Sequence, residues 1–407
     1  MVTILKSSVV WSENVYVRST MGFLLGIVIA VALASVVGRS AASIENMIRE
    51  QGYPFEKHSV VTDDGYILTL HRIPHGKNQS GKVGRPVLLW HAILCSSDVW
   101  VVSRPDKALA FILADKGYDV WMANSRGNTH SRKHKTLSLQ SAEYWNFSFH
   151  EIGYYDVPAC IDYILQQTGH NSLQYIGHSQ GTTIFFVLAS TRPEYNKKIS
   201  HMTALAPIAF LGNTNGIIRV LFFFSPIVEV FYQVTGTYEF LTGTSIVHPI
   251  AKGICLPDTV LGNLCNNIIY LSVGYDSQQW NMTLAYNVYD FIPAGSSVKQ
   301  FSHYSQIAKS GGSFRKYDYS YSKNFEIYSQ YEPPNYDLSK ITIPVTLYYG
   351  KNDWLSRVQD VMKLQSKLPN SIAKLVPYPA FNHLDFLWAN DVVPLLYEDL
   401  VENMEKY

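Results

Sequence analysis

The sequence has few cysteines and almost no net charge, and both shortages narrow the classes of protein to which it can belong. Four cysteines in 407 residues are too few for a disulfide scaffold, so the chain must fold around a hydrophobic core. The 33 basic and 32 acidic residues leave a net charge of +1, which gives no reason to expect nucleic acid as a partner. Internal repeats and low-complexity segments are absent as well.

Long apolar runs are scarce too. Only residues 22–38 form an uncharged run that approaches the roughly 20 residues needed to span a bilayer. Lys6 and Arg18 precede this run and small residues follow it, so we predict a cleaved signal peptide within residues 1–42 and no stable transmembrane anchor after cleavage. A signal anchor is the alternative, because 17 residues is a borderline length.

Entry into the secretory pathway makes disulfides possible and gives meaning to Asn-x-Ser/Thr sequons. Cys255 and Cys265 close a short loop and form the bridge that we prefer, whereas Cys95 and Cys160 lie in apolar surroundings and are expected to be free, buried thiols. Three sequons are candidate N-glycosylation sites: Asn78, Asn146 and Asn281.

Apolar strands alternate with helical patterns along most of the chain, which predicts an α/β fold with a mostly parallel central sheet and helices on both faces. A hairpin at 58–74 precedes the alternation. The expected strands are 87–90, 119–123, 173–176, 202–205, 344–349 and 374–376, and the expected helices are 104–116, 155–168, 182–189, 357–368 and a terminal helix from Pro394.

The alternation stops near Phe210 and returns after Asp337. We therefore predict a core in two parts, 43–209 and 338–407, with a mostly helical cap at 210–337 inserted between them. Within the cap, residues 217–241 are dense in large apolar side chains. Packing of cap helices is the favoured interpretation, and the alternative is that part of this face lines an acyl pocket or meets a lipid interface.

A Gly-x-Ser-x-Gly pattern at Gly177, Ser179 and Gly181 lies between an apolar strand and an apolar helix. In that context the serine occupies a strained turn that presents its hydroxyl above the edge of a sheet. The flanking glycines let the strand and the helix come close together.

A serine hydroxyl needs a histidine to take its proton and a carboxylate to orient that histidine. Asp353 follows the strand at 344–349, and His383 follows the strand at 374–376. The chain order serine, acid, histidine and both positions after strands are those that this architecture requires, so we predict a Ser179–Asp353–His383 triad. Among the rivals, Asp385 is expected to support the loop of His383, and His178 is expected to point away from the serine.

The oxygen of a tetrahedral intermediate needs backbone donors. The N–H of Gln180, the residue after the serine, supplies one of them. The second should come from the loop after an earlier strand, His91-Ala92-Ile93-Leu94, where we favour the N–H of Ile93.

Several long segments, in the right order, resemble the gastric and lysosomal acid lipase family of α/β-hydrolases. They are TDDGYILTLHRIPHG (62–76), NSRGNTHSRKHKTLS (124–138), YYDVPACIDYIL (154–165), YIGHSQGTT (175–183), SGGSFRKYDY (310–319) and FNHLDFLWA (381–389). The resemblance implies hydrolysis of neutral lipid esters at a lipid–water interface, a mobile lid and a secreted or lysosomal location. It also matches the triad, the two oxyanion donors and the Cys255–Cys265 bridge.

One departure concerns the oxyanion loop, which in this family reads His-Gly but here reads His91-Ala92. If the second position requires a positive φ, alanine there costs about 1 kcal/mol or more.

The leading hypothesis is a serine lipase of the triacylglycerol type that uses no metal and no cofactor. A sterol-ester or other carboxyl-ester hydrolase is the alternative within the same chemistry. The alternative from another class is a lipid-binding protein that has lost turnover on the same scaffold, for which Ala92 is the only supporting feature.

Overall fold

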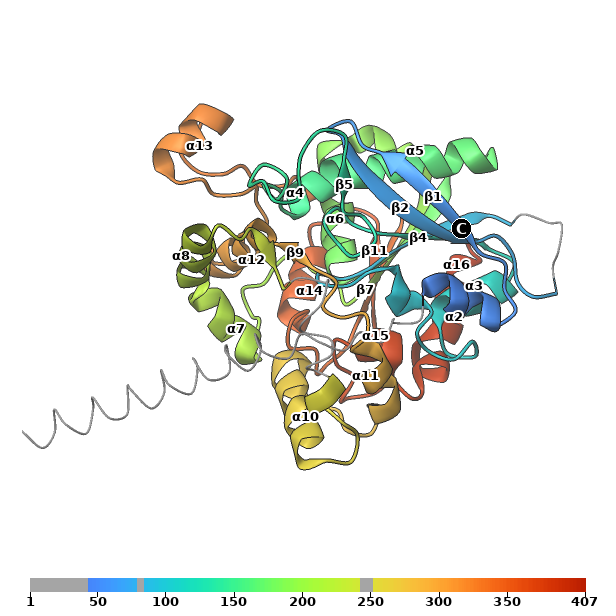
Figure 1. Ribbon diagram of the computed structural model, residues 1–407. Helices are drawn as coiled ribbons and strands as arrows, with labels where there is room; N and C mark the ends of the chain where they lie inside the picture. Colours follow the sequence, from blue (N-terminus) through green and yellow to red (C-terminus); the bar gives the residue numbers. More distant parts are fainter. Residues whose placement is uncertain (1–42, 79–83, 242–251) are drawn as a thin grey trace, which may run out of the picture.

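A nine-stranded sheet forms the centre of the computed structural model, which describes residues 43–78, 84–241 and 252–407 (Figure 1). The predicted signal region, residues 1–42, lies outside the described residues. The strand order is β1-β2-β4-β3-β6-β7-β10-β11, and β5 pairs with β2. From β4 to β11 all neighbouring strands are parallel, whereas β1, β2 and β5 pair in antiparallel fashion at one side. The strands are β1 (Glu56–Val61), β2 (Tyr66–Ile73), β3 (Pro86–Trp90), β4 (Asp119–Ala123), β5 (Lys133–His134), β6 (Leu173–His178), β7 (Ile199–Leu205), β10 (Val345–Tyr349) and β11 (Ser371–Leu375).

Both faces of the central strands β3, β4 and β6 are buried, as expected for parallel strands covered by helices. Alternate residues of β3 enter two different cores: Leu88 and Trp90 join one, and Val87 and Leu89 join the other. The first core also contains residues of α5 (Val157–Thr168), α6 (Gln180–Thr191) and α14 (Val358–Gln365). The second contains residues of α2 (Ile44–Glu50), α3 (Leu109–Asp115), α15 (Asp385–Trp388) and α16 (Glu398–Met404). The α/β-hydrolase fold class predicted from the sequence is confirmed by this architecture.

Several predicted elements have different bounds in the structure; the helix expected at 357–368, for example, is α14, Val358–Gln365. The helix expected over 104–116 begins only at Leu109, because Pro105 disfavours helical backbone at Arg104 and residues 104–108 form a turn instead. The strand expected at 374–376 is β11, Ser371–Leu375, whose bounds follow from its pairing with β10 rather than from its apolar residues.

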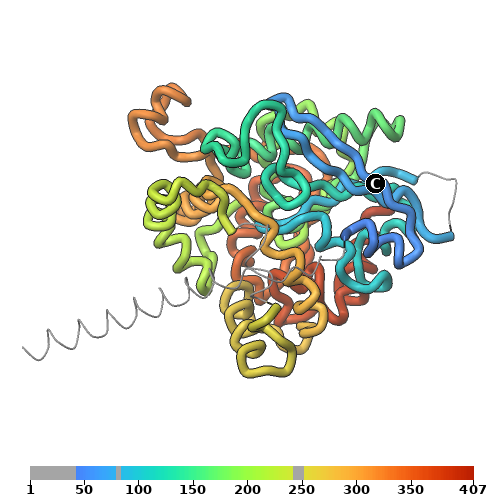
Figure 2. The backbone as a smooth tube through the Cα atoms, viewed as in Figure 1, coloured from blue at the N-terminus to red at the C-terminus, as the bar shows by residue number. Residues whose placement is uncertain are grey.

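The segment between β7 and β10 adds no described strand to the nine-stranded sheet. Its yellow-green to orange trace gathers along one side of the molecule, while the red C-terminal segment returns to the sheet (Figure 2). A disulfide joins Cys255 to Cys265, with 5.7 Å between their Cα atoms. The elements of this segment are α7 (Gly216–Phe223), α8 (Ser225–Thr235), β8 (Glu239–Phe240), α10 (Val260–Val273), α11 (Met282–Val288), β9 (Ser296–Ser297), α12 (Val298–Lys309) and α13 (Tyr321–Tyr328).

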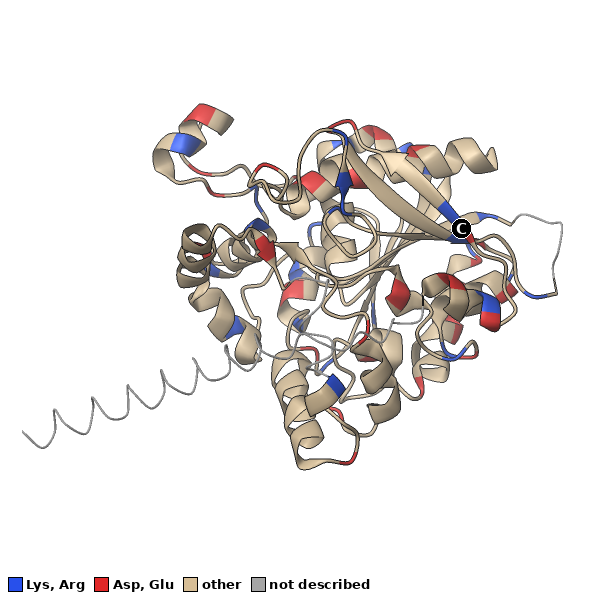
Figure 3. Ribbon diagram, viewed as in Figure 1, with Lys and Arg blue, Asp and Glu red and all other residues tan. Residues whose placement is uncertain are grey.

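Packing does not explain most of the apolar residues at 217–241, so the favoured interpretation of that stretch is wrong for most of them. Phe222 is buried and Ile218 and Val228 pack against the main core, but many other large side chains of α7 and α8 are exposed. Figure 3 shows that α7, α8 and α10 carry very few charged residues. No single described helix is long and apolar enough to cross a membrane; α7 and α8 pass that test only together, with a bend of 60° between them.

Candidate active site

Ser179 lies on the sharp turn between β6 and α6, at the carboxyl end of a central strand. Its backbone has φ 53° and ψ −113°, a left-handed conformation that is unfavourable for a residue with a side chain. The Ser179 N–H donates to the carbonyl of Leu205 on β7 at 3.0 Å, which anchors the turn to the sheet. The strained strand–turn–helix geometry expected for Ser179 is therefore present.

The two glycines of the motif are required by close backbone contacts. A Cβ atom at Gly181 would lie 2.1 Å from the carbonyl oxygen of Trp90, and one at Gly177 would lie 2.6 Å from the backbone of Gly181. Any larger residue would push α6 away from β3 and β6.

Asp353 and His383 meet at the same edge of the sheet, although 30 residues separate them in the chain. Asp353 follows β10 and His383 follows β11, and the Nδ1 of His383 lies 2.8 Å from the Oδ2 of Asp353. The other oxygen of Asp353 accepts the N–H groups of Leu355 and Ser356 at 2.8 Å each. Both side chains are buried, so the carboxylate is fixed in position and holds the imidazole by Nδ1.

His178, the residue before the serine, contacts the loop of His383 in a way that the sequence did not predict. Its Nε2 donates to the backbone carbonyl of His383 at 3.0 Å, which leaves Nδ1 unprotonated and buried, with no partner among the described residues. Burial, together with the charge of His383, lowers the pKa of His178 to about 3. His178 is thus a neutral side chain that joins the serine turn to the histidine loop, and no sequence pattern distinguishes it from a core histidine.

Ser179 itself is almost enclosed, with 7% of its surface exposed, and its Oγ is not hydrogen-bonded to His383 in the structure. Hydrogen bonds of this kind are often formed only when substrate is bound. The arrangement brings the Ser179 turn and a carboxylate-oriented imidazole to one edge of the sheet, as nucleophilic catalysis requires.

The loop after β3 has its strained residue at a different position from the one that the sequence comparison singled out. Leu94 has φ 61°, whereas Ala92 does not have a positive φ. The cost expected for alanine at position 92 therefore does not arise in this structure. The Leu94 carbonyl accepts the N–H of Ala294 at 2.7 Å, and this contact fixes the loop to the segment before β9.

His91 joins the loop after β3 to the segment after β4 through hydrogen bonds that the sequence analysis did not predict. Its Nε2 accepts the N–H of Ser125 at 3.1 Å and faces the amide nitrogen of Asn128 at 3.2 Å. The proton therefore lies on Nδ1, which donates to the carbonyl of Ala92 at 2.7 Å. Burial lowers the pKa of His91 to about 4, which keeps it neutral. Ser125 and Asn128 belong to the segment 124–138 that carries the family resemblance, but their contacts with His91 required the structure.

The two predicted oxyanion donors follow the ends of neighbouring strands. Trp90 on β3 pairs with Gly177 on β6, so Ile93 and Gln180 follow adjacent strand ends. Gln180 is the first residue of α6, where backbone N–H groups lack partners within the helix. Its side-chain amide donates to Gln300 on α12, which links the serine turn to the inserted segment.

Known proteins resemble this chain over almost all of its length. Residues 44–104 match the family model for a partial alpha/beta-hydrolase lipase region, and residues 85–225 match the model for the alpha/beta hydrolase fold. Lipase 3 of Drosophila melanogaster is 41% identical over 395 residues, covering 95% of this chain and 100% of its own. Human gastric triacylglycerol lipase is 42% identical, with 88% and 90% covered, and human lysosomal acid lipase/cholesteryl ester hydrolase is 38% identical, with 92% and 94% covered.

The chain belongs to the acid lipase family of α/β-hydrolases. It is a carboxylic ester hydrolase, as the sequence analysis predicted. Among solved structures, a putative lipase from Sulfolobus solfataricus aligns with a TM-score of 0.59, covering 91% of this chain and 98% of its own. At 13% identity that likeness supports the fold alone.

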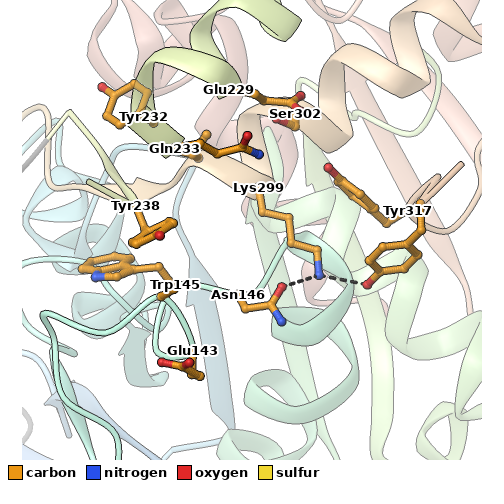
Figure 4. A pocket seen from close by; sticks show the side chains of 13 residues that line it. Glu143, Trp145, Asn146, Glu229, Tyr232, Gln233, Tyr238, Lys299, Ser302 and Tyr317 are labelled. Carbon is orange, nitrogen blue, oxygen red and sulfur yellow. Dashed lines mark hydrogen bonds between the residues drawn. The ribbon is translucent and has the colours of Figure 1, made fainter. Parts of the chain in front are cut away.

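A cavity of about 370 Å³ lies beside the inserted segment of this lipase, between α8, α12 and the loop at 142–146 (Figure 4). Trp145, Tyr232, Tyr238 and Tyr317 surround it, and Lys299 donates across its edge to Asn146 and Tyr319 at 2.9 Å each. Ser179, Asp353 and His383 do not line it.

The remaining predicted residues are placed as follows. Asn78, Asn146 and Asn281 are all exposed, and Asn281 also caps α11 by accepting the N–H of Leu284 at 3.0 Å. Cys95 and Cys160 are free and buried, and burial raises the pKa of Cys95 to about 12. Within the part of the chain that the structure describes, no group of three or more His, Cys, Asp or Glu side chains is arranged to hold a metal ion.

Proposed function

We propose that this lipase cleaves the ester bonds of neutral lipids, with triacylglycerols as the principal substrate, through an acyl-enzyme on Ser179. The observation that supports this most directly is the buried contact of 2.8 Å between His383 Nδ1 and Asp353 Oδ2, at the sheet edge that carries the strained serine turn. The two relatives named for gastric triacylglycerol lipase and lysosomal acid lipase/cholesteryl ester hydrolase agree with this substrate class.

In the proposed reaction, His383 takes the Ser179 proton on Nε2 while Asp353 keeps Nδ1 protonated and the ring oriented. The serine oxygen attacks the ester carbonyl, and the N–H groups of Gln180 and Ile93 stabilise the resulting oxyanion. His383 then protonates the leaving alcohol. Water, activated by the same imidazole, releases the fatty acid from Ser179.

The inserted segment, which we assign to residues 210–337 between core parts 43–209 and 338–407, would cover the serine and contact lipid. Ser179 is only 7% exposed, so an acyl chain reaches it only if the cover moves. On α8, Ile227, Val230, Phe231 and Val234 recur at the spacing of one helix face and are 57–81% exposed. Such a face suits a lipid–water interface, since its burial there is favourable. We also propose a secreted or lysosomal location and glycans at the three exposed sequons.

The test is hydrolysis of emulsified triolein by the purified glycoprotein. We expect Ser179→Ala to abolish turnover while its circular dichroism spectrum and thermal midpoint match the wild type. Labelling of the wild type, but not of the variant, by a serine-directed phosphonate would exclude the lipid-binding alternative. A cholesteryl oleate emulsion measured in parallel separates triacylglycerol from sterol-ester preference. If Ser179→Ala retained triolein turnover, the mechanism would be wrong.

A further inference from the structure

The cavity of about 370 Å³ between α8, α12 and the loop at 142–146 has a glycosylation sequon on its lining. Asn146 is exposed there and begins an Asn-x-Ser pattern with Phe147 and Ser148. None of the three proposed triad residues lines the cavity, so the proposed reaction leaves it unexplained. Its volume is nevertheless in the range of roughly 300–1,000 Å³ that is typical of ligand pockets in proteins.

The side chain of Asn146 is held by its oxygen and is free at its nitrogen. Its Oδ1 accepts a hydrogen bond from Lys299 Nζ at 2.9 Å, and the same ammonium donates to the Tyr319 hydroxyl at 2.9 Å (Figure 4). Lys299 Nζ also lies 5.1 Å and 4.9 Å from the ring centroids of Tyr317 and Tyr319, which restrains it further. Asn146 Nδ2, the atom that carries the sugar in an N-linked glycan, donates to no residue that the structure describes.

The cavity lining combines flat aromatic rings with hydrogen-bonding groups, and this combination suits a carbohydrate. Tyr232, Tyr238 and Tyr317 supply rings on which the C–H face of a sugar can stack. Gln233 and Ser302 supply partners for sugar hydroxyl and acetamido groups. The Oγ of Ser302, which is 1% exposed, has no hydrogen-bond partner among the described residues. A sugar can satisfy this buried hydroxyl, whereas an acyl chain would leave it unpaired.

We infer that the first sugar of an N-linked glycan on Asn146 occupies this cavity and joins the loop at 142–146 to the inserted segment. The inference rests on the glycan proposed above for this sequon. In the attachment reaction, Asn146 Nδ2 forms a bond to C1 of the first N-acetylglucosamine, and the bond from C1 to the diphosphate of a lipid-linked donor breaks. The amide gives up one proton, and Oδ1 keeps the hydrogen bond from Lys299.

The sugar contacts α8 on the side away from its exposed apolar face. Glu229, Tyr232 and Gln233 recur at the spacing of one helix face and line the cavity. Phe231 and Val234 lie on the other side of the helix and are 60% and 81% exposed. A sugar in the cavity therefore holds α8 from its polar side and keeps its apolar side directed outward.

Protection from a glycan-releasing amidase is the direct test, on protein secreted from a eukaryotic host. Peptide mapping first shows whether Asn146 carries a glycan. We expect the amidase to release this glycan about tenfold more slowly from the native protein than from the unfolded protein, because the sugar must first leave the cavity. The glycan on Asn281 is the matched control, since Asn281 is exposed and does not line the cavity, and its release should differ little between the two states.

A double-mutant cycle tests the contact between sugar and protein. Asn146→Gln removes the glycan, and Tyr238→Leu removes an aromatic ring from the cavity wall while keeping an apolar side chain. We expect Tyr238→Leu to lower the thermal midpoint by about 1–2 °C more in the glycosylated protein than in the Asn146→Gln background, since the ring then has a sugar to lose. Asn281→Gln should be additive with Tyr238→Leu.

These measurements need no turnover and can be made in a Ser179→Ala background. A failure of the lipase proposal would be seen separately, in the triolein assay. An occupied, protected Asn146 whose glycan couples to Tyr238 supports the inference. It would be overturned by an unoccupied Asn146, by equal release rates from native and unfolded protein, or by additive midpoint shifts, because the sugar would then be absent or would extend into solvent.

Discussion

The candidate catalytic edge of the sheet and the outer helices of the inserted segment are built in opposite ways. Ser179, Asp353 and His383 are at most 7% exposed and lie on backbone that many hydrogen bonds hold in place. On α8 and α10, by contrast, Val234 and Val260 are 81% and 86% exposed. The residues that we propose for catalysis are therefore buried and hydrogen-bonded, as chemistry between fixed atoms requires. The apolar side chains of α8 and α10 are instead exposed, where a large partner such as a lipid surface can cover them.

The contrast predicts that a change at the catalytic edge destroys turnover without destroying the fold. Asp353→Asn should lower kcat by about 10³–10⁴-fold, because the amide no longer holds His383 Nδ1 in the required tautomer. The measurement is kcat on a soluble short-chain ester, with unfolding followed in parallel. Asp360→Asn, which alters another buried carboxyl, should affect stability and leave kcat near the wild-type value. Equal losses of kcat in both variants would mean that Asp353 is merely structural.

The two regions should also differ in how well they tolerate an added methyl group. Gly181→Ala places a Cβ atom 2.1 Å from the Trp90 carbonyl oxygen, so we expect the free energy of unfolding to decrease by about 1–3 kcal/mol and turnover to fall with it. Gly253→Ala is the control in the inserted segment, where an added Cβ meets nothing within 4 Å. Chemical denaturation of both variants checks the difference, and a neutral Gly181→Ala would show that the turn can relax.

Much of the geometry of the candidate catalytic edge could be predicted from the sequence, because the patterns that mark it are local in the chain. Strand–turn–helix patterning around Ser179 and the positions of Asp353 and His383 after strands are local properties of the chain. His178 and Asn128 were not predictable in the same way, because their partners are distant in sequence or are backbone atoms. The exposure of Phe231 also escaped prediction, since apolar spacing at 3.6 residues is the same for a buried helix and for one that awaits a partner.

The apolar face of α8 should matter for emulsions and not for soluble substrate. Phe231→Ser and Val234→Ser each remove a side chain that the lipid would cover, which corresponds to about 1–2 kcal/mol and to roughly a tenfold rise in apparent KM on triolein. Turnover of a soluble ester and the thermal midpoint should stay unchanged. Val61→Ser is the control, because Val61 is 45% exposed on β1, outside the insertion. If the two variants lost as much activity on the soluble ester as on triolein, these residues would support the fold rather than contact a lipid interface.

The smallest effect is expected at the loop after β3, which carries the proposed oxyanion donor Ile93. This loop contacts the inserted segment through the hydrogen bond from the Ala294 N–H to the Leu94 carbonyl. Ala92→Gly should change kcat by no more than about threefold and lower the free energy of unfolding by about 0.5–1 kcal/mol, since Ala92 does not occupy a left-handed conformation and glycine only adds freedom to the unfolded chain. Leu94→Gly is the informative partner, because position 94 has φ 61° and glycine relieves about 1 kcal/mol of backbone strain there. The free energy of unfolding and the kcat on a soluble ester, measured for both variants, separate relief of backbone strain from an effect on catalysis. If Ala92→Gly raised kcat more than tenfold, alanine at position 92 would be displacing the Ile93 N–H, and the loop would be optimised for something other than this reaction.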